Sequence, residues 1–266
     1  MTIIDDLIFL LEKNTKEISI PKIKRITIGM LFILIELENG ISGLAFNKIE
    51  KDFHKHVKDA GNLTSRSIFD LVEKARFDED VEKSIGIAAI NAISQLILTQ
   101  NNYSLKTDLD IVDFMEFKST ETCGMIGNIA PLVQRIVQKV KKLTVIEDNP
   151  KRWDVPAGVK IFKHHEDLKN INKLIITGSA ILYKSFDSII KNNSSLEKVA
   201  IVGPTMGTLP EPFFQRGIHA IGGMKILNPE KVHQIIMQAG GTPQFSKYCE
   251  KYLIINSHSK NYSPST

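Results

Sequence analysis

The chain has 266 residues, of which 42% are hydrophobic and 24% are charged. This composition is ordinary for a globular protein and excludes a wholly disordered chain, a collagen-like repeat and a small disulfide-stapled module. The 34 basic residues are nearly balanced by 30 acidic ones, which leaves a net charge of +4. So mild an excess gives no indication of a nucleic-acid partner. The length favours two domains.

The cysteine and hydropathy patterns define the expected cellular setting. The two cysteines, Cys123 and Cys249, are too few for a disulfide framework or a CxxC metal knuckle. We therefore expect a reducing, cytoplasmic environment. No apolar run reaches the roughly 18–20 residues of a membrane span, and acidic residues near the start replace the basic residues of a signal peptide. The sequence predicts no membrane contact.

The first part of the chain predicts a small α+β domain. We expect helices at 2–16, 67–77 and 81–99, and strands at 24–37 and 41–47. The strand 24–37 is rich in β-branched residues, and Asn39-Gly40 supplies the positive φ angles of a hairpin turn. The helix 81–99 is apolar on nearly all sides and should be buried. Strands followed by helices are typical of an α+β arrangement.

From about residue 105 the pattern changes, because apolar runs alternate with helical segments. After a short helical linker at 109–117, we expect strands at 119–125, 143–147, 173–177, 198–203 and 218–221, and helices at 131–142, 180–191 and 229–239. This alternation predicts a parallel sheet with crossover helices. We therefore predict an α/β protein with domains at 1–105 and 106–256, followed by a disordered polar tail at 257–266.

A glycine-containing loop lies between the strand 119–125 and the next helix. Gly127 and Asn128 stand in this loop, and Pro131 suits the first helical turn, where a missing N–H costs nothing. Glu147 ends the next strand, 20 residues after Gly127. In dinucleotide-binding folds an acid near this spacing contacts ribose hydroxyls, although the glycine pattern here is not GxGxxG. The alternative is a tight strand–helix turn without a ligand.

Two more loops follow predicted strands. Thr177-Gly178 opens a helix after KLIIT, where its polar groups could hold an anion or act as ordinary caps. The stretch 203–212, which begins Gly203-Pro204-Thr205, holds three prolines and two glycines in ten residues. Loops at the carboxyl ends of parallel strands line the usual ligand crevice, so we expect these loops to meet at one sheet edge.

Metal ligands are sparse in the sequence. The histidine pairs, including His54 with His56, have no second set of ligands at the spacing of a metal site. Cys123, at a strand, is predicted to be a buried and inert thiol. The sequence also lacks GxSxG, HExxH and Walker A patterns, so the common hydrolase and NTPase mechanisms find no support.

Several stretches, taken together, carry a family resemblance. These are CGMIGNIAPLV, LTVIEDNP, LIITGSAILYKSFDSII and VAIVGPTMGTLPEPFFQRGIHAIGGMKILNPEKV, with IGMLFILIELENGISGLAF and SIGIAAINAIS in the first half. In this order and spacing they resemble the putative heavy-metal chelation family of prokaryotic proteins. The resemblance covers about residues 5–245. It implies an enolase-N-terminal-like α+β domain followed by a Rossmann-like parallel-sheet domain.

The resemblance also implies a ligand cleft between the two domains and a role in handling a metal or a metal-binding compound. Carried over by motif, its candidate ligand-binding residues are Gly127, Asn128, Pro131, Glu147, Thr177, Gly178, Gly203, Pro204 and Thr205, with Asn91 reaching in from the first domain. For Asn91 the alternative is a hydrogen bond that packs its helix. Oxygen-rich, histidine-poor surroundings suit a hard cation or a ligand-borne chelate.

Three functions are considered at this level, and one of them is a non-enzymatic binding or metallochaperone role, which the scarcity of cysteine and clustered histidine makes less suited to soft metals. The leading hypothesis is binding of a metal, a metal chelate or an anionic small molecule in the interdomain cleft. The alternative is an enzyme that uses a nucleotide-type cofactor, either a dinucleotide or S-adenosylmethionine. The spacing between Gly127 and Glu147 favours this alternative. The expected partner is a small molecule or a metal, and an exposed strand edge in the first domain is compatible with a homodimer.

Overall fold

The computed structural model describes residues 2–49, 56–78, 80–193 and 196–257. The chain forms two compact units. Unit 1 comprises Met1–Ser104, Pro204–Pro212 and Gly223–Tyr252, and unit 2 comprises Leu105–Gly203, Phe213–Gly222 and Leu253–Thr266. Two segments from within the range 106–256 thus have most of their contacts in unit 1. Apart from Ser257, the predicted tail lies outside the described residues, as does His54.

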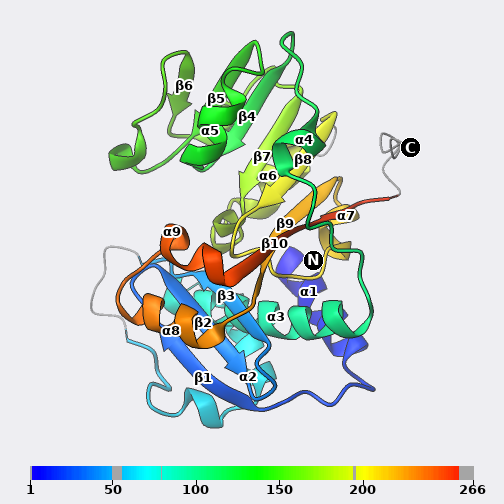
Figure 1. Ribbon diagram of the computed structural model, residues 1–266, viewed down its shortest axis with the longest axis vertical. Coiled ribbons are helices and arrows are strands. Elements are labelled where there is room, and N and C mark those ends of the chain that lie inside the picture. The colour runs from blue at the N-terminus through cyan, green and yellow to red at the C-terminus, as the bar shows by residue number, and fades with distance from the viewer. Residues whose placement is uncertain (1, 50–55, 79, 194–195, 258–266) are drawn as a thin grey trace. The chain divides into compact units, whose positions relative to one another are not determined.

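Unit 1 contains a three-stranded antiparallel sheet in the order β1-β2-β3 (Figure 1). Its strands are β1 (Ile23–Ile28), β2 (Phe32–Leu37) and β3 (Ser42–Phe46). The expectation of a single strand at 24–37 was wrong, because the chain turns between β1 and β2, where the Gly29 N–H donates to the Phe32 carbonyl (2.9 Å). The predicted Asn39-Gly40 turn is confirmed, with Gly40 at φ +83°.

Helices cover both faces of this sheet. The helices of unit 1 are α1 (Ile3–Asn14), α2 (Ile68–Val72), α3 (Asp80–Gln100), α8 (Pro229–Met237) and α9 (Thr242–Phe245). On one face Gly43 of β3 lies so close to Ala92 of α3 that a Cβ would come within 2.1 Å of its backbone nitrogen. On the other face Phe32 and Leu34 pack against Val232 of α8. Every residue of β2 is therefore buried.

Helix α3 is the central helix of unit 1. In the part of the chain that the structure describes, it is the one helix long and apolar enough, by length and composition, to cross a membrane. However, 89% of the apolar window of this helix, within Val81–Gln100, is buried inside the protein, as in the core helix of a globular domain. The predicted buried helix at 81–99 is confirmed.

Unit 2 is built on a seven-stranded sheet in the order β10-β9-β8-β7-β4-β5-β6. Its strands are β4 (Thr122–Ile126), β5 (Lys142–Ile146), β6 (Val159–Phe162), β7 (Lys173–Thr177), β8 (Lys198–Val202), β9 (Ala220–Ile226) and β10 (Cys249–Ile255), with β9 and β10 contributing residues to both units. The pairs from β6 to β9 are parallel. The six strands β4 to β9 have the strand order of doubly wound sheets. Successive strands are added on one side of β4 up to β6 and on its other side from β7 onward, so the strand order reverses between β4 and β7.

The short helix α4 (Ile111–Met115) precedes these strands. The helices α5 (Ala130–Ile136), α6 (Phe186–Asn193) and α7 (Glu211–Phe214) connect them, with the 3₁₀ turns Pro150–Arg152, His165–Asp167 and Gly178–Leu182. Two helices are shorter than expected. The helix predicted at 131–142 ends at Ile136, and the one predicted at 180–191 is interrupted at 183–185. Strands β6 and β10 were not predicted.

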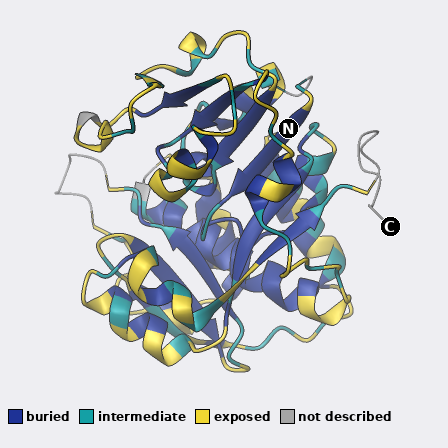
Figure 2. Ribbon diagram, turned by 45° about the horizontal axis from the view of Figure 1, so that its top comes forward, coloured by how far each residue is buried: buried dark blue, intermediate teal, exposed yellow. Residues whose placement is uncertain are grey.

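The core of unit 2 lies along the sheet, whose strands are mostly buried (Figure 2). Met125, Val145 and Ile175 come from three parallel strands and are fully buried in one cluster. The predicted fold class is confirmed: the protein is α/β, with a small antiparallel sheet and a larger, mostly parallel one.

Candidate functional site

The loops after β4 and β7 meet where the strand order of unit 2 reverses. Gly127 follows β4 at φ +81°, a backbone conformation that glycine adopts far more readily than other residues. A Cβ at Gly127 would lie 2.4 Å from Cγ2 of Thr177, the last residue of β7. The absence of a side chain at Gly127 therefore lets the two loops come into contact. A reversal of strand order is also the place where open α/β sheets bind ligands.

The loop after β8 joins the same group. Gly203 has φ +146°, and a Cβ at this position would lie 3.4 Å from the backbone nitrogen of Gly178. The hydroxyls of Thr177 and Ser179 face each other at 3.2 Å. The predicted residues Gly127, Thr177, Gly178 and Gly203 are thus brought together at the carboxyl edge of three neighbouring strands. This arrangement offers backbone groups and two hydroxyls to one region.

Glu147 organises the adjacent corner of this edge. Its carboxylate accepts hydrogen bonds from the backbone N–H groups of Asn128 (3.0 Å) and Asn149 (3.1 Å). Arg152 Nη1 lies 3.3 Å from the same carboxylate, which is nearly fully buried. Both carboxylate oxygens are therefore already engaged by groups of the protein. In this arrangement Glu147 holds the backbone of the two loops in place. A ligand hydroxyl could bind its carboxylate only by competing with these protein donors.

Asn128 links this corner to the loop after β4. Its Nδ2 donates to the Arg152 carbonyl (2.6 Å), and Arg152 Nη2 donates to the Asn128 carbonyl (2.6 Å). The Asn128 side chain is 6% exposed, yet its Oδ1 has no hydrogen-bond partner. Buried side-chain oxygens are rarely left unpaired, so this atom is the most direct sign of an additional group at this edge.

Pro131 occupies the first turn of α5, as predicted, and is exposed. Its ring fixes the backbone where the chain leaves the loop after β4, and it has no N–H to offer a ligand. Its contribution is therefore to the shape of the loop.

Three other predicted residues belong to unit 1. Asn91 of α3 donates through Nδ2 to the carbonyls of Leu44 (2.8 Å) and Thr205 (2.7 Å), and Thr205 Oγ1 accepts the Phe46 N–H (3.0 Å). These contacts tie the segment that starts at Pro204 to β3 and α3, which is the packing role considered for Asn91. The Asn91 Oδ1 is buried without a partner. The expected cleft between the domains stays a prediction.

The described residues offer little to a bare metal ion. They contain no group of three or more His, Cys, Asp or Glu side chains placed to hold one. Burial raises the pKa of Cys123 to about 12 and that of Cys249 to about 11, which keeps both thiols protonated. Since a thiol binds metal as its thiolate, neither cysteine is a ready soft ligand. This environment agrees with the prediction that Cys123 is a buried and inert thiol.

The sequence reasoning did not single out Arg152. It stands five residues after Glu147, in a loop that contains Asn149 and Pro150, and no spacing rule marks it. Its importance comes from the 3₁₀ turn at Pro150–Arg152, which returns the guanidinium to both Glu147 and Asn128. Folding of the loop after β5, rather than a motif, creates this contact.

Comparison with known proteins gives two matching family models, both described as "Putative heavy-metal chelation". DUF364 matches residues 110–255, and DUF4213 matches residues 12–94. An uncharacterized protein of Methanocaldococcus jannaschii is 24% identical over 228 residues, which cover 83% of this chain and 84% of that protein.

Solved structures share the fold. A protein of unknown function from the DUF364 family of Pyrococcus horikoshii has a TM-score of 0.76 and 21% identity, covering 96% of this chain and 100% of that chain. Another DUF364 protein of unknown function, from Desulfitobacterium hafniense, has a TM-score of 0.74 and 18% identity, covering 95% and 99%. At these identities the likeness concerns the fold alone.

Proposed function

Because this chain belongs to the DUF364 family, whose description is putative heavy-metal chelation, we propose that it binds a metal as an anionic chelate. The chelate, or a similar anionic small molecule, lies at the loops that follow β4, β7 and β8 in unit 2. One observation carries the proposal: Gly127 touches Thr177 and Gly203 lies beside Gly178, so three loops converge at the reversal of strand order.

The chemistry of this edge favours a chelate over a free ion. A bare heavy-metal ion needs several protein ligands, and the described residues contain no suitable group of His, Cys, Asp or Glu. A chelate brings its own ligands to the metal and presents carboxylate or similar oxygens to the protein. The hydroxyls of Thr177 and Ser179 hydrogen-bond each other, so one of them donates to the other and the remaining hydroxyl hydrogen can be donated to such an oxygen.

Asn128 and Glu147 would act at one end of the bound molecule. The unpaired Asn128 Oδ1 can accept a hydrogen bond from a ligand hydroxyl or a metal-bound water. Glu147, with Arg152, fixes the backbone that positions Asn128. The nucleotide-dependent alternative would need Glu147 to receive ribose hydroxyls, in competition with two backbone N–H donors and a guanidinium.

The direct test is calorimetric titration with three probes: nickel nitrilotriacetate, ferric citrate and free Ni²⁺. We expect a chelate to bind with one-to-one stoichiometry and free Ni²⁺ to bind far more weakly. Thr177→Val removes the hydroxyl while retaining Cγ2 against Gly127, and it should weaken chelate binding about five- to tenfold. Thr107→Val, an exposed position elsewhere in unit 2, is the matched control.

Three results would contradict the proposal. Free Ni²⁺ binding as tightly as either chelate would indicate a protein-only metal site. Chelate binding that is equally strong in wild type and in Thr177→Val would move the ligand away from this edge. Binding of a dinucleotide or S-adenosylmethionine without any chelate binding would favour the enzyme alternative.

A further inference from the structure

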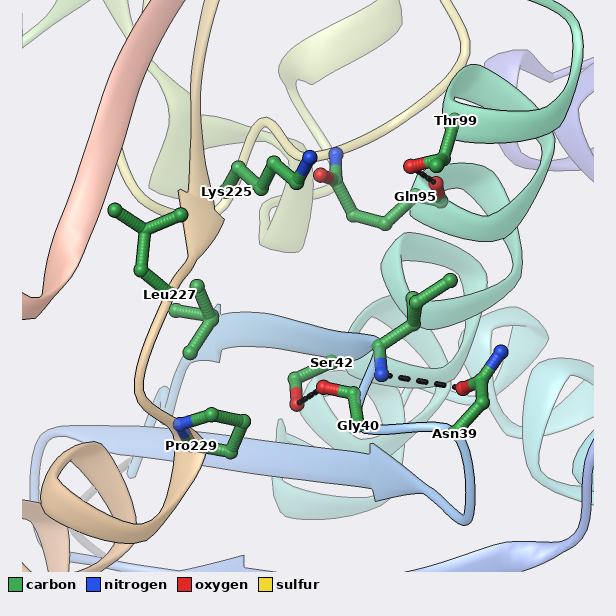
Figure 3. A pocket seen from close by; sticks show the side chains of 10 residues that line it. Asn39, Gly40, Ser42, Gln95, Thr99, Lys225, Leu227 and Pro229 are labelled. Carbon is green, nitrogen blue, oxygen red and sulfur yellow. Dashed lines mark hydrogen bonds between the residues drawn. The ribbon is translucent and has the colours of Figure 1, made fainter.

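Unit 1 holds a pocket whose lining residues all belong to that unit. Its volume is about 350 Å³, within the range of sites for small molecules. Three segments form it: the β2–β3 turn at 39–42, the last part of α3, and the end of β9 with the turn that follows (Figure 3). These segments lie far apart in the sequence, so no motif marks the pocket.

Lys225 gives the pocket its charge. It is the one charged residue among the side chains that line the pocket. Figure 3 shows its side chain extending toward Gln95 of α3. No ion pair joins Lys225 to a carboxylate within the described parts of the chain, and its side chain is half-buried. An ammonium group in this position is available to an anionic group of a ligand.

Gln95 is a fixed polar group in the pocket wall. Its side chain is 4% exposed, and its Nε2 donates to the Gly207 carbonyl (2.8 Å) and to the Tyr252 hydroxyl (2.7 Å). Both donor sites of the amide are therefore used. What remains for a ligand is the carbonyl oxygen, an acceptor held in place by these two bonds.

The two hydroxyls of the pocket already donate their hydrogens to backbone carbonyls. Thr99 Oγ1 donates to the Gln95 backbone carbonyl (2.8 Å), and Ser42 Oγ donates to the Gly40 carbonyl (3.1 Å). Figure 3 draws both contacts. Because each hydroxyl has one hydrogen and it is already used, each can only accept from a ligand. The pocket thus offers one cation and several acceptor oxygens.

Apart from Asn39, whose Oδ1 accepts the Ile41 N–H (3.1 Å), the rest of the wall is apolar. Ile41, Leu227 and Pro229 line it, and Leu227 is 58% exposed despite its size. Figure 3 places Leu227 and Pro229 together on the wall formed by the segment after β9. An aliphatic group of a ligand would cover this surface and remove it from water.

We propose that this pocket binds a small hydroxy- or amino-carboxylate with a short aliphatic chain. The carboxylate pairs with Lys225, and the aliphatic chain covers Leu227 and Pro229. The single hydrogen of a ligand hydroxyl is donated to Thr99 Oγ1, whereas the three hydrogens of an ammonium can be shared among the acceptor oxygens of Gln95, Thr99 and Ser42. A carboxylate without a hydroxyl or ammonium group would give the acceptor oxygens no hydrogen-bond donor. A neutral polyol would give the Lys225 ammonium no anionic partner. The inference is independent of the chelate site in unit 2.

The test is calorimetric titration with 2-hydroxy-4-methylpentanoate and L-leucine, alongside 4-methylpentanoate and 4-methylpentanamide. We expect the first two to bind, the acid without a hydroxyl to bind more weakly, and the uncharged amide not to bind. Lys225→Met keeps the length of the side chain but removes its charge, and it should weaken binding at least tenfold. The control is Lys139→Met, which changes an exposed lysine in the turn after α5 in unit 2 and should have no effect on binding.

A second variant separates the two parts of the recognition. Thr99→Val removes one acceptor, so it should weaken 2-hydroxy-4-methylpentanoate about fivefold and leave 4-methylpentanoate unchanged. Absence of binding by both hydroxy- and amino-carboxylate probes would overturn the proposal. So would equal binding in wild type and Lys225→Met, or binding of the amide as tight as that of the acids. Binding lost in Thr177→Val but kept in Lys225→Met would place these probes at the other site.

Discussion

At the amino end of the sheet in unit 2, β7 and β8 begin with buried lysines, whereas at the carboxyl end the same strands run into Thr177-Gly178 and Gly203. Lys173 and Lys198 are direct neighbours in the register of the two strands. Lys173 is 1% exposed and pairs with Glu121 (2.8 Å), and Lys198 pairs with Glu116. Two like charges side by side are thus each balanced by a carboxylate.

The remaining donors at the amino edge are also satisfied. Lys173 donates to the Glu116 carbonyl (2.8 Å), and Lys198 donates to the Phe114 carbonyl (2.9 Å). Both carbonyls belong to the end of α4, where Glu116 adopts φ +49°. The lysines therefore fasten this helix end to the sheet. At the carboxyl edge, by contrast, Asn128 leaves a buried oxygen unpaired.

The comparison of the two edges shows where polar groups stabilise the fold and where they are available to a ligand. At one edge the buried lysines are paired with carboxylates and bound to backbone carbonyls. Glycines and a partly unpaired amide at the other edge cost stability and keep room for a ligand. Substitutions at the amino edge should therefore change the free energy of unfolding most, and those at the carboxyl edge should change binding as well.

The largest expected effect is that of Lys173→Met. Removing the ammonium leaves the buried Glu121 carboxylate and the Glu116 carbonyl without their partner, so unfolding should become about 3–5 kcal/mol easier. Urea denaturation measures this loss. The matched control is Lys142→Met, at the start of β5 on the same edge, which has no ion pair among the described residues and should cost less than about 1 kcal/mol. Equal losses in the two variants would show that the pair with Glu121 is not special.

Gly127→Ala should have the next largest effect. The new Cβ would lie 2.4 Å from Thr177 Cγ2 at φ +81°, so we expect a loss of about 2–3 kcal/mol and weaker chelate binding. Thr177→Ser removes Cγ2 and keeps the hydroxyl. The double variant should regain part of the stability in urea denaturation, while no recovery at all would assign the cost to the backbone conformation alone.

Local patterns in the sequence were sufficient for much of this architecture. Runs such as KLIIT and KVAIV, with helical segments after them, predicted β7 and β8 and placed their following loops at one edge. The Asn39-Gly40 pair predicted its turn. The contact of Gly127 with Thr177 follows from two loops that lie 50 residues apart, and only the fold defines which strands are neighbours.

Other features had no local signal. The turn between β1 and β2 was missed because apolar Met30 and Leu31 occupy it, although Met30 is 66% exposed. Nothing near Lys173 or Lys198 distinguishes them from surface lysines, because the carboxylates that lie nearest to their ammonium groups, those of Glu121 and Glu116, are more than 50 residues away along the chain. The pocket around Lys225 likewise combines three distant segments.

Glu147→Gln should have a smaller effect on stability than either change above. A glutamine retains one acceptor oxygen for the backbone donors but loses the charge that attracts Arg152, so we expect a loss of about 1–2 kcal/mol in urea denaturation. If the carboxylate shapes the loop, chelate affinity should fall because Asn128 shifts. Unchanged affinity together with reduced stability would limit Glu147 to a structural role.

The smallest expected effect is the pH dependence of the Glu121 contribution. Burial raises the pKa of Glu121, but the hydrogen bond from Lys173, the backbone N–H of Lys118 and the nearby charges outweigh it, so its pKa in the folded protein is lowered below the usual 4.5. The unfolded chain then takes up the proton first as the pH falls, and stability from this carboxylate is present above about pH 4.5 and lost below it. The difference in unfolding free energy between wild type and Glu121→Gln at pH 7 should shrink as the pH is lowered toward 3. A difference that stays constant from pH 7 to pH 3 would mean that the charge of Glu121 does not support the amino edge, and the contrast between the two edges would then rest on Lys173 and its carbonyl partner alone.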